Sequence, residues 1–434
     1  MAANKTELLN QTDASQDQII SFLGDMVRAQ KEGEAAIQAL VSKRMATIGC
    51  QIEDLTYDPV GMMLKDEFAD EQAINAGERV SVIGRYPSSE GGQSLIIFAH
   101  PDGEPISNTE GWKHDPFAAE IDAGKMYGWG VADDLMGVAA GVCALEMITK
   151  SKIKLKGEVI MASTPSKRHA RGVTAVLNNG YSSDAALYLH PAESGLGLRE
   201  IKALASGQLI FNLRIQGQRP DTTEPGHVAF SHQAINPINK AVLLHQALME
   251  LGEERAKRVF HPLLDAAVGR STNVMVSAIQ SGFDKSLTQM SEMCEMACAV
   301  SYPPSETIAS VRAEIEAAIY ACVSADPWMK ETPPEVIWLS GVTGTEVTDD
   351  HPIYQTVAGA ITDVTGIKPA VNAMHTTSDI RVPLVQKGIP TVGIGSLGGN
   401  LSQTGLTDEW VDLEDFMNLV KTTAAIIVDW CGAE

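Results

Sequence analysis

The chain has 434 residues, of which 44% are hydrophobic and 20% are charged, a composition typical of a globular protein with two or more domains. Its formal net charge of -22 argues against a nucleic-acid partner, because phosphate binding needs a positive surface. Residues 1–18 hold no apolar signal core after a basic start, and no apolar run approaches the roughly twenty residues that cross a bilayer, so we expect a cytoplasmic protein with no membrane partner.

The first part of the chain alternates between helical and extended patterns. Helical spacing of apolar residues over 16–49 predicts two opening helices, and residues 80–85 and 94–98 are expected to form strands. The second of these strands is almost entirely apolar, which is typical of a strand buried on both faces of a sheet. A packed helix is predicted at 137–148. This order of strand, loop and helix indicates an open α/β sheet, in which binding crevices lie at the carboxyl ends of the strands.

The pattern changes near Gly207 and returns to its first form after a Gly-rich turn at 341–344. Between these points we predict a strand at 209–215, a helix at 234–251, further strands, a helix at 306–323 and a strand at 336–339. We expect disorder only at the two chain termini.

Two junctions between strand and loop carry residues suited to metal chemistry. The apolar strand at 94–98 leads into His100-Pro101-Asp102, and the Gly-rich loop that follows contains Asp133 and Asp134. An imidazole can bind an ion through one ring nitrogen while a nearby carboxylate orients the ring through the other. Either segment alone is equally consistent with a capped turn and solvated acids. Together they favour a divalent metal site, with Asp133 or Asp134 as an oxygen ligand.

Several motifs occur in a fixed order along the chain. They are His100-Pro-Asp102, Trp112-x-x-Asp115-Pro-Phe117, Gly128-x-Gly-x-x-Asp133-Asp134 and Ser378-Asp379-Ile380-Arg381. In this order they resemble the aminoacylase, carboxypeptidase G and succinyl-diaminopimelate desuccinylase family of metallopeptidases, over most of the chain. The resemblance implies an α/β fold: a mixed-sheet, zinc-peptidase-like catalytic domain with helices on both faces, and an inserted smaller α+β lid and dimerisation domain.

The resemblance also implies a division into domains and roles for particular residues. Residues 1–206 and 345–434 would form the catalytic domain and residues 207–344 the lid, with a homo-oligomer, a dimer or larger, as the assembly. In the family the His of His-x-Asp binds metal, its Asp is a catalytic residue behind that His, and the first Asp after the glycines bridges two metals. These roles fall on His100, Asp102 and Asp133.

Three departures from the family pattern remove metal ligands. Residues 164–172 lack the Glu-Glu pair that supplies the family's general base and one ligand. His190 stands where the family carries an acidic ligand before Pro, and Gly405 replaces the last metal-binding His, four residues before the Glu. The set that is left, His100, Asp133 and His190, suits one ion with open positions for water and substrate. We therefore expect one divalent transition metal, with manganese favoured and zinc, cobalt or iron as alternatives.

The loop at 164–172 is basic where the family is acidic. Its cationic side chains are those of Lys167, Arg168, His169 and Arg171. Turned inward, they suit an anionic substrate or adduct, with His169 as a catalytic candidate and the other three as substrate-binding candidates. A solvated cationic loop explains each of them equally well. His375 is a further binding candidate because it precedes a matched motif, although a structural loop His is an equally good interpretation.

Loss of the Glu base bears on the reaction. An amide needs its amine leaving group protonated, whereas on an electron-poor aromatic ring the withdrawing substituent itself holds the negative charge that develops when hydroxide adds. The departures resemble the branch of the family that converts 5-nitroanthranilate to 5-nitrosalicylate and ammonia. We predict a metal-dependent aminohydrolase for a small anionic aminobenzoate, in which Asp102 orients His100 and Asp134 positions the water.

Two alternatives stay open. A peptidase or N-acyl amino acid deacylase that recruits a different base would release an amino acid from its substrate. A non-catalytic metal or ligand binder built on the same scaffold would release neither an amino acid nor ammonia.

Overall fold

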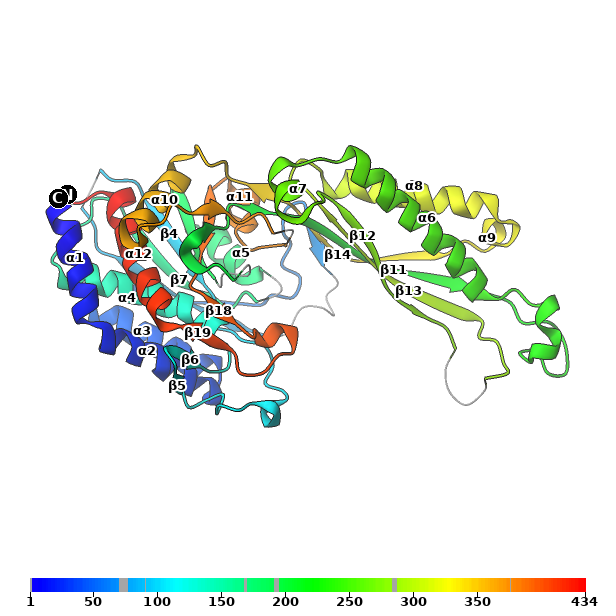
Figure 1. Cartoon of the computed structure of the whole chain (residues 1–434), viewed down its shortest axis with the longest axis horizontal. Coiled ribbons are helices and arrows are strands. Elements are labelled where there is room, and N and C mark those ends of the chain that lie inside the picture. Colours follow the sequence, from blue (N-terminus) through cyan, green and yellow to red (C-terminus); the bar gives the residue numbers. More distant parts are fainter. Residues whose placement is uncertain are drawn as a thin grey trace.

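The computed structural model of the protein describes residues 2–69, 77–89, 91–167, 170–190, 195–282, 287–374 and 376–434. The molecule consists of two units that lie end to end along its long axis (Figure 1). The larger unit contains both ends of the chain, and the smaller one is built mainly from the middle of the sequence.

A mixed sheet forms the centre of the larger unit. Among the described residues its strands follow the order β1 (Gln51–Tyr57), β3 (Arg79–Tyr86), β7 (Val159–Ser163), β4 (Leu95–Ala99), β8 (Ala185–Leu189) and β17 (Thr391–Ile394). The pairs β7–β4, β4–β8 and β8–β17 are parallel, whereas β1–β3 and β3–β7 are antiparallel. The carboxyl ends of the parallel strands therefore meet at one end of the sheet, where the loops that carry the candidate residues begin.

Helices cover both faces of this sheet, because alternate side chains of each buried strand point to opposite sides. One face packs against α2 (Gln16–Ala29), α3 (Glu34–Thr47), α4 (Met136–Lys150), α10 (Pro352–Thr365) and α12 (Leu413–Cys431). The other face packs against α5 (Arg171–Asn178) and the region of α11 (Arg381–Lys387). The predicted α/β class, with helices on both faces of a mixed sheet, is confirmed.

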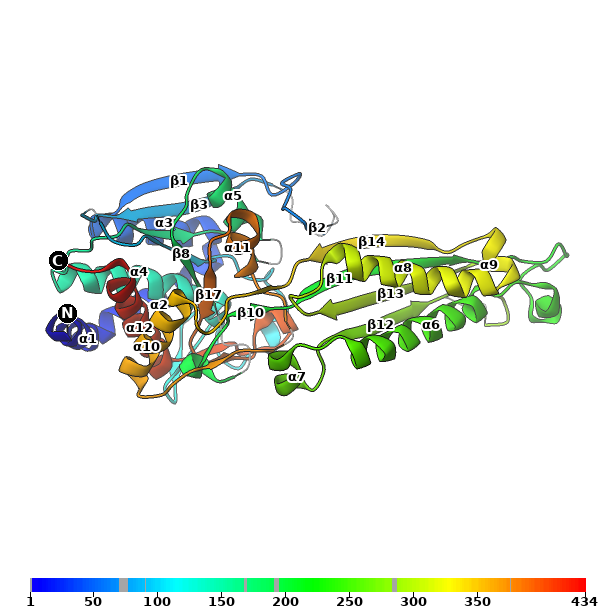
Figure 2. The same cartoon turned by 90° about the horizontal axis from the view of Figure 1, so that it is seen from above.

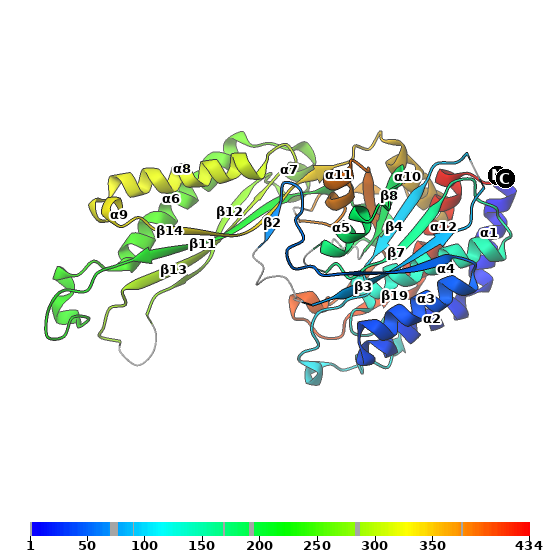
Figure 3. The ribbon, with the colours of Figure 1, turned by 180° about the vertical axis from the view of Figure 1, so that it is seen from behind.

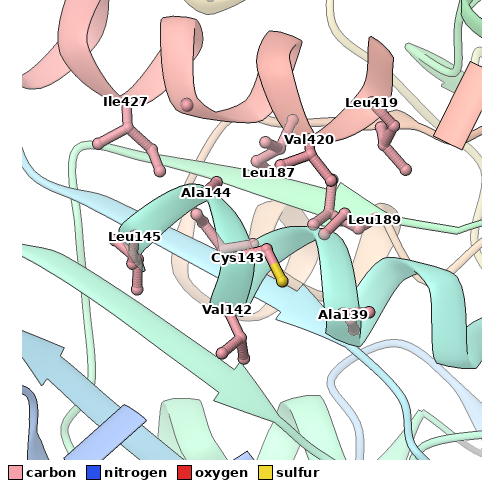
Figure 4. Close-up of a cluster of buried hydrophobic side chains, with 14 of the residues drawn as sticks. Ala139, Val142, Cys143, Ala144, Leu145, Leu187, Leu189, Leu419, Val420 and Ile427 are labelled. Carbon is pink, nitrogen blue, oxygen red and sulfur yellow. The ribbon is translucent and has the colours of Figure 1, made fainter. Parts of the chain in front are cut away.

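Helix α4 anchors the acidic loop that precedes it. Every residue from Met136 to Ile148 is buried. Figure 4 shows Ala139 and Cys143 of this helix in one buried cluster with Leu187 of β8 and Val420 of α12. A helix that is apolar on all sides is stable only inside a core, where each fully buried aliphatic side chain contributes about 1.5–3 kcal/mol. The start of α4 is therefore held rigidly against the end of β8.

The N-terminal segment differs from the prediction. Residues expected to be disordered form helix α1 (Ala2–Ala14), so that prediction is wrong at this end. Leu8 is fully buried in the main core, and the Lys5 ammonium lies 2.5 Å from Asp429 and 2.7 Å from Asp363. Packing against α12 orders a segment whose own sequence is polar.

The smaller unit has two layers. Its antiparallel sheet has the strand order β12 (Asn273–Gln280), β13 (Met293–Tyr302), β11 (Gly207–Gln216), β14 (Glu335–Val342) and β2 (Phe68–Ala69) among the described residues. Helices α6 (Pro237–Arg258) and α8 (Ile308–Ala325) cover one face of it (Figure 2), and the two layers enclose a separate hydrophobic core.

Strand β2 joins the two units although it belongs to the first part of the chain. It pairs with β14 at the junction, as Figure 3 shows from behind. Phe68 lies against Gly341, where an added Cβ would be 2.3 Å from the Phe68 ring, so this close approach needs glycine. The sequence pattern did not predict this two-residue strand.

The remaining elements are short and mostly line the junction or the edges of the larger unit. They are α7 (Pro262–Val268), α9 (Pro327–Glu331), β5 (Ile121–Asp122), β6 (Lys125–Tyr127), β9 (Glu200–Ile201), β10 (Leu204–Ala205), β15 (Thr345–Glu346), β16 (Ala370–Val371), β18 (Gly398–Gly399) and β19 (Trp410–Asp412). In the part of the chain that the structure describes, no helix has the length and apolar character to span a membrane.

Candidate metal and active site

His100 and Asp133 lie against each other at the carboxyl end of β4. The His100 Nε2 atom is 3.2 Å from Asp133 Oδ1, and both residues are buried. Strand β4 ends one residue before His100, while Gly130, with a φ of 67°, turns the chain into the short helix η4 (Val131–Leu135) that carries Asp133. Two segments predicted separately from the sequence thus meet.

Asp102 contacts His100 mainly through its main chain. The Nδ1 atom of His100 lies 3.0 Å from the Asp102 carbonyl oxygen and 3.6 Å from Oδ1. The Asp102 carboxylate instead accepts hydrogen bonds, each 3.0 Å long, from the main-chain N–H groups of Ser166 and Lys167. The carbonyl group is therefore the nearer partner of the His100 ring, and the carboxylate holds the loop that follows β7.

The side chain of Asp134 holds the main chain of His100. Its Oδ2 atom accepts a 3.2 Å hydrogen bond from the His100 N–H group. Its Oδ1 atom is buried and has no hydrogen-bond partner among the described residues. Burial raises the pKa of Asp134 well above its usual range, and the neighbouring Asp133 charge adds to this against the opposing effect of His100.

Lys167 brings a positive charge to the site. Its Nζ atom is 2.5 Å from Asp133 Oδ2 and 3.3 Å from the Asp133 carbonyl oxygen. The side chain of Lys167 is only 7% exposed, so little water screens this ion pair. The contact gives Lys167 a partner inside the protein, whereas the sequence suggested an external anion.

The opposite charges of Asp133, His100 and Lys167 stabilise one another's charged forms. Burial alone raises the pKa of Asp133, but the charge of Lys167 and the hydrogen bond from His100 outweigh it and lower this pKa below its ordinary range. Burial alone lowers the pKa of His100, but the hydrogen bond to Asp133 and the charges of the three nearby aspartates raise it to about 9. Burial also lowers the pKa of Lys167, and its interaction with Asp133 raises it overall.

Glu409 is a site residue for which sequence reasoning found no role. It is fully buried, and its carboxylate accepts hydrogen bonds of 3.0 to 3.3 Å from the main-chain N–H groups of Gly130, Ala132, Asp133 and Ser402. Burial raises the pKa of Glu409, and the Asp133 charge raises it further. The carboxylate fixes the loop that carries Asp133. Its place four residues after Gly405, in a segment that resembles the family, is the sequence signal that could have found it.

His190 follows β8 but its ring lies to one side of this cluster. An added Cβ on Gly393 would be 2.6 Å from His190 Nε2, so the ring packs against β17 at this glycine. It lines a small cavity of about 10 Å³ together with Glu200, Lys202 and Asn372. Within the described residues, no three side chains of the His, Cys, Asp and Glu types converge as a metal-binding group. His100 and Asp133 are brought together, and His190 is not.

Of the remaining candidates for substrate binding and catalysis, the structure describes only Arg171. Arg171 begins α5 and is buried; burial lowers its pKa, while the charge of Glu67 raises it and that of Arg381 lowers it further. Arg168, His169 and His375 lie outside the described residues.

The donors that lie together here suit a divalent transition metal ion. One oxygen of Asp133 already contacts Lys167, so this carboxylate offers a single oxygen, beside His100 Nε2. A carboxylate oxygen and an imidazole nitrogen are donors that manganese, iron, cobalt and zinc all accept. A third protein ligand at His190 requires its ring to turn away from Gly393.

Comparison with known proteins places the chain in a family. The model described as peptidase family M20/M25/M40 matches residues 96–429, which is well over half of the sequence. The chain belongs to this M20 family. It is a metal-dependent hydrolase of the peptidase and amidohydrolase type, and its two-unit fold is that of the family.

One M20 relative is an N-formyl-4-amino-5-aminomethyl-2-methylpyrimidine deformylase from Halalkalibacterium halodurans. It is 25% identical over 364 residues, which cover 79% of this chain and 80% of the relative. Its name describes removal of a formyl group from an N-formyl compound.

Several of the similar solved structures are peptidases. The di-peptidase Dug1p from Saccharomyces cerevisiae has a TM-score of 0.71 at 14% identity and covers 99% of both chains. Aminopeptidase PepT from Bacillus cereus has a TM-score of 0.69 at 17% identity, with coverage of 95% and 98%. The dinuclear metal-binding peptidase YxeP from Bacillus subtilis has a TM-score of 0.62 at 16% identity, with coverage of 97% and 100%. At these identities the likeness establishes the fold.

Proposed function

We propose that this M20 hydrolase removes an amino group from a small, anionic, electron-poor aminobenzoate. The specific reaction is hydrolysis of 5-nitroanthranilate to 5-nitrosalicylate and ammonia. The observation that carries the proposal is that Lys167 faces Asp133 at the position where the family resemblance implies a glutamate. With Ser166 and Lys167 in that loop, the site lacks the carboxylate pair that would shuttle a proton from water to an amine. An aromatic substrate that carries its own electron sink depends less on such a shuttle.

The proposed ligands are His100, Asp133 and His190, and one divalent ion, with manganese favoured, would supply a Lewis acid that activates water at neutral pH. The His100 ring is held at Nδ1 by the Asp102 carbonyl oxygen, which leaves Nε2 directed at Asp133 and available as a donor. Asp134 fixes the main chain of His100 and keeps a second buried carboxyl group beside the site, where we propose that it positions water.

Substrate anions would meet the basic loop. We propose Arg168, Arg171 and His375 as partners for the ring carboxylate and nitro group, with His169 as a proton carrier to the leaving ammonia. Lys167, the remaining cation of this loop, is instead paired with Asp133. Guanidinium groups suit this role because they bind planar carboxylates through two parallel hydrogen bonds.

Substrate profiling of the manganese-loaded full-length protein tests the proposal. We expect ammonia release and a change in absorbance with 5-nitroanthranilate, and no amino acid release from dipeptides or N-acyl amino acids. His100→Ala and Asp133→Ala should each lower kcat/KM by about 100-fold or more, because second-shell changes alone cost 10–100-fold at metal sites. Asp122→Ala, an exposed carboxylate in β5, is the control and should be unchanged. Turnover of peptides without ammonia release from the aminobenzoate would contradict the proposal.

Hydrolysis of an N-formyl or N-acyl group is a second candidate. It is favoured by the 25% identity to the pyrimidine deformylase over most of both chains. Formate release from N-formyl aminomethylpyrimidine, measured beside the ammonia assay, separates the two reactions. A binder without catalytic activity would give neither product.

A further inference from the structure

We propose that Lys167 is a built-in cation that limits this site to one exchangeable divalent ion. The inference rests on the one-ion function proposed above and deepens it. It differs from the substrate-binding role that the sequence suggested for Lys167.

The division of the Asp133 carboxylate is the first support. Its Oδ2 atom contacts the Lys167 ammonium at 2.5 Å, and its Oδ1 atom lies 3.2 Å from His100 Nε2. A carboxylate that bridges two ions needs both oxygens free for metal. Here Asp133 Oδ2 already contacts Lys167 Nζ, so only Oδ1, which faces His100, can accept an ion.

The way the lysine is held is the second support. The main-chain N–H groups of Ser166 and Lys167 both donate to the Asp102 carboxylate, and the Ser166 hydroxyl donates to Asp379 at 3.3 Å. The Lys167 side chain is 7% exposed and its Nζ atom also donates to the Asp133 carbonyl oxygen. A lysine on the surface would lose this contact easily, whereas this one is anchored at both the main chain and the tip.

The charge of the surroundings is the third support. Asp133 and Glu409 are buried beside the Lys167 ammonium, and their negative charges favour a cation at this point. A second divalent ion on Oδ2 would have to displace the ammonium or lie against it. Because the pocket is poorly solvated, the repulsion between the two cations would be only weakly screened. The Lys167 ammonium group therefore balances the negative charge that a second metal ion would otherwise balance. Unlike a metal ion, it cannot be removed by dialysis.

Counting bound ions tests this directly. Full-length protein is stripped of metal, dialysed against Mn²⁺ over a concentration series, and analysed for bound manganese by mass spectrometry and by the electron paramagnetic resonance signal of paired ions. We expect one ion in the wild type and no paired-ion signal. Lys167→Glu supplies a carboxylate in place of the ammonium and should bind a second ion. Lys167→Met should bind its first ion about tenfold more tightly, because the competing charge is gone.

Two matched variants control for charge and for lysine loss in general. Lys167→Arg keeps the cation and should stay at one ion. Lys154→Met removes a lysine whose side chain is 79% exposed and should match the wild type in count and affinity. Two ions in the wild type, or unchanged count and affinity in both Lys167→Glu and Lys167→Met, would overturn the inference. If those two variants do not fold, as judged by circular dichroism, Lys167→Gln, which removes the charge and keeps a polar side chain, is titrated in their place, and unchanged count and affinity in it would overturn the inference.

The outcome is separate from that of the ammonia assay. One ion in the wild type without ammonia release would refute the proposed reaction and leave the built-in cation standing. Two ions with ammonia release would refute the built-in cation and leave the reaction standing.

Discussion

At the scale of single residues, Asp102 links the two halves of the site. Its carbonyl oxygen lies 3.0 Å from the His100 ring, while its carboxylate holds the loop that presents Lys167 to Asp133. One residue therefore sets the position of both the imidazole donor and the ammonium group.

Replacing Asp102 tests this double role. Asp102→Ala leaves the buried N–H groups of Ser166 and Lys167 without their acceptor, so we expect the free energy of unfolding to fall by about 2–4 kcal/mol. Asp102→Asn keeps one acceptor oxygen and should lose about half as much. Urea denaturation followed by fluorescence measures both, with Asp122→Ala as the exposed control. An Asp102→Ala variant as stable as the wild type would show that the loop does not depend on this carboxylate.

Sequence reasoning predicted the pair of His100 and Asp133 because both lie where buried strands end. It could not predict the partner of Lys167, since the path of that loop depends on the distant Asp102 carboxylate. The role of Glu409 was equally hidden, because its partners are main-chain groups about 280 residues earlier, which leave no residue-type signature. The direction of the His190 ring depends on the space that Gly393 leaves on the neighbouring strand.

At the scale of elements, the first turn of α4 leaves almost no room beside the site. An added Cβ on Gly137 would be 2.4 Å from Asp134 Oδ1 and 2.7 Å from the Leu189 carbonyl oxygen. The close approach of helix α4 to the end of β8 therefore requires a glycine here, directly beside the Asp134 carboxylate that holds the His100 main chain.

A pair of helical glycines makes this testable. Gly137→Ala should destabilise the protein by about 1–3 kcal/mol through overpacking and should weaken manganese binding, because Asp134 and then His100 must shift. Gly359→Ala in α10 has open space around the new methyl group and should be neutral or stabilising by up to about 1 kcal/mol. Thermal unfolding and the manganese titration compare the two. Equal effects of both substitutions would contradict the packing argument.

The elements themselves were mostly predictable from periodicity. The strands β3 and β4 and the helix α4 appear within a few residues of their predicted positions. The helix α1 was missed because its polar sequence becomes ordered only through contacts with α12, and the strand β2 because two residues carry no alternating pattern. Both depend on partners far away in the sequence.

At the scale of the whole molecule, a buried ion pair sits where the two units meet. The Arg381 guanidinium donates to both carboxylate oxygens of Glu67, at 2.8 and 3.2 Å, and to Asp379 at 2.9 Å. Glu67 also accepts a 3.0 Å hydrogen bond from the N–H group of Thr343, just after β14. The carboxylate therefore joins α11 of the larger unit to the segment that leaves the smaller one.

Breaking this pair should be costly. Glu67→Ala leaves the buried Arg381 with only part of its charge balanced, and we expect a loss of about 3–5 kcal/mol in unfolding free energy together with faster proteolysis near the junction. Glu335→Ala breaks an exposed pair with Arg214 in the smaller unit and should cost less than about 1 kcal/mol. Urea denaturation and a limited-proteolysis time course report the difference. A Glu67→Ala variant that behaves like Glu335→Ala would refute a joining role.

The polar chain at the junction does not stop at Arg381. Asp379, which Arg381 holds, also accepts from the hydroxyl of Ser166, the residue next to Lys167. A relay of hydrogen bonds thus runs without interruption from Thr343 to the loop beside Asp133. The contacts that join the two units and the contacts that position the loop of Lys167 therefore belong to one connected set of hydrogen bonds.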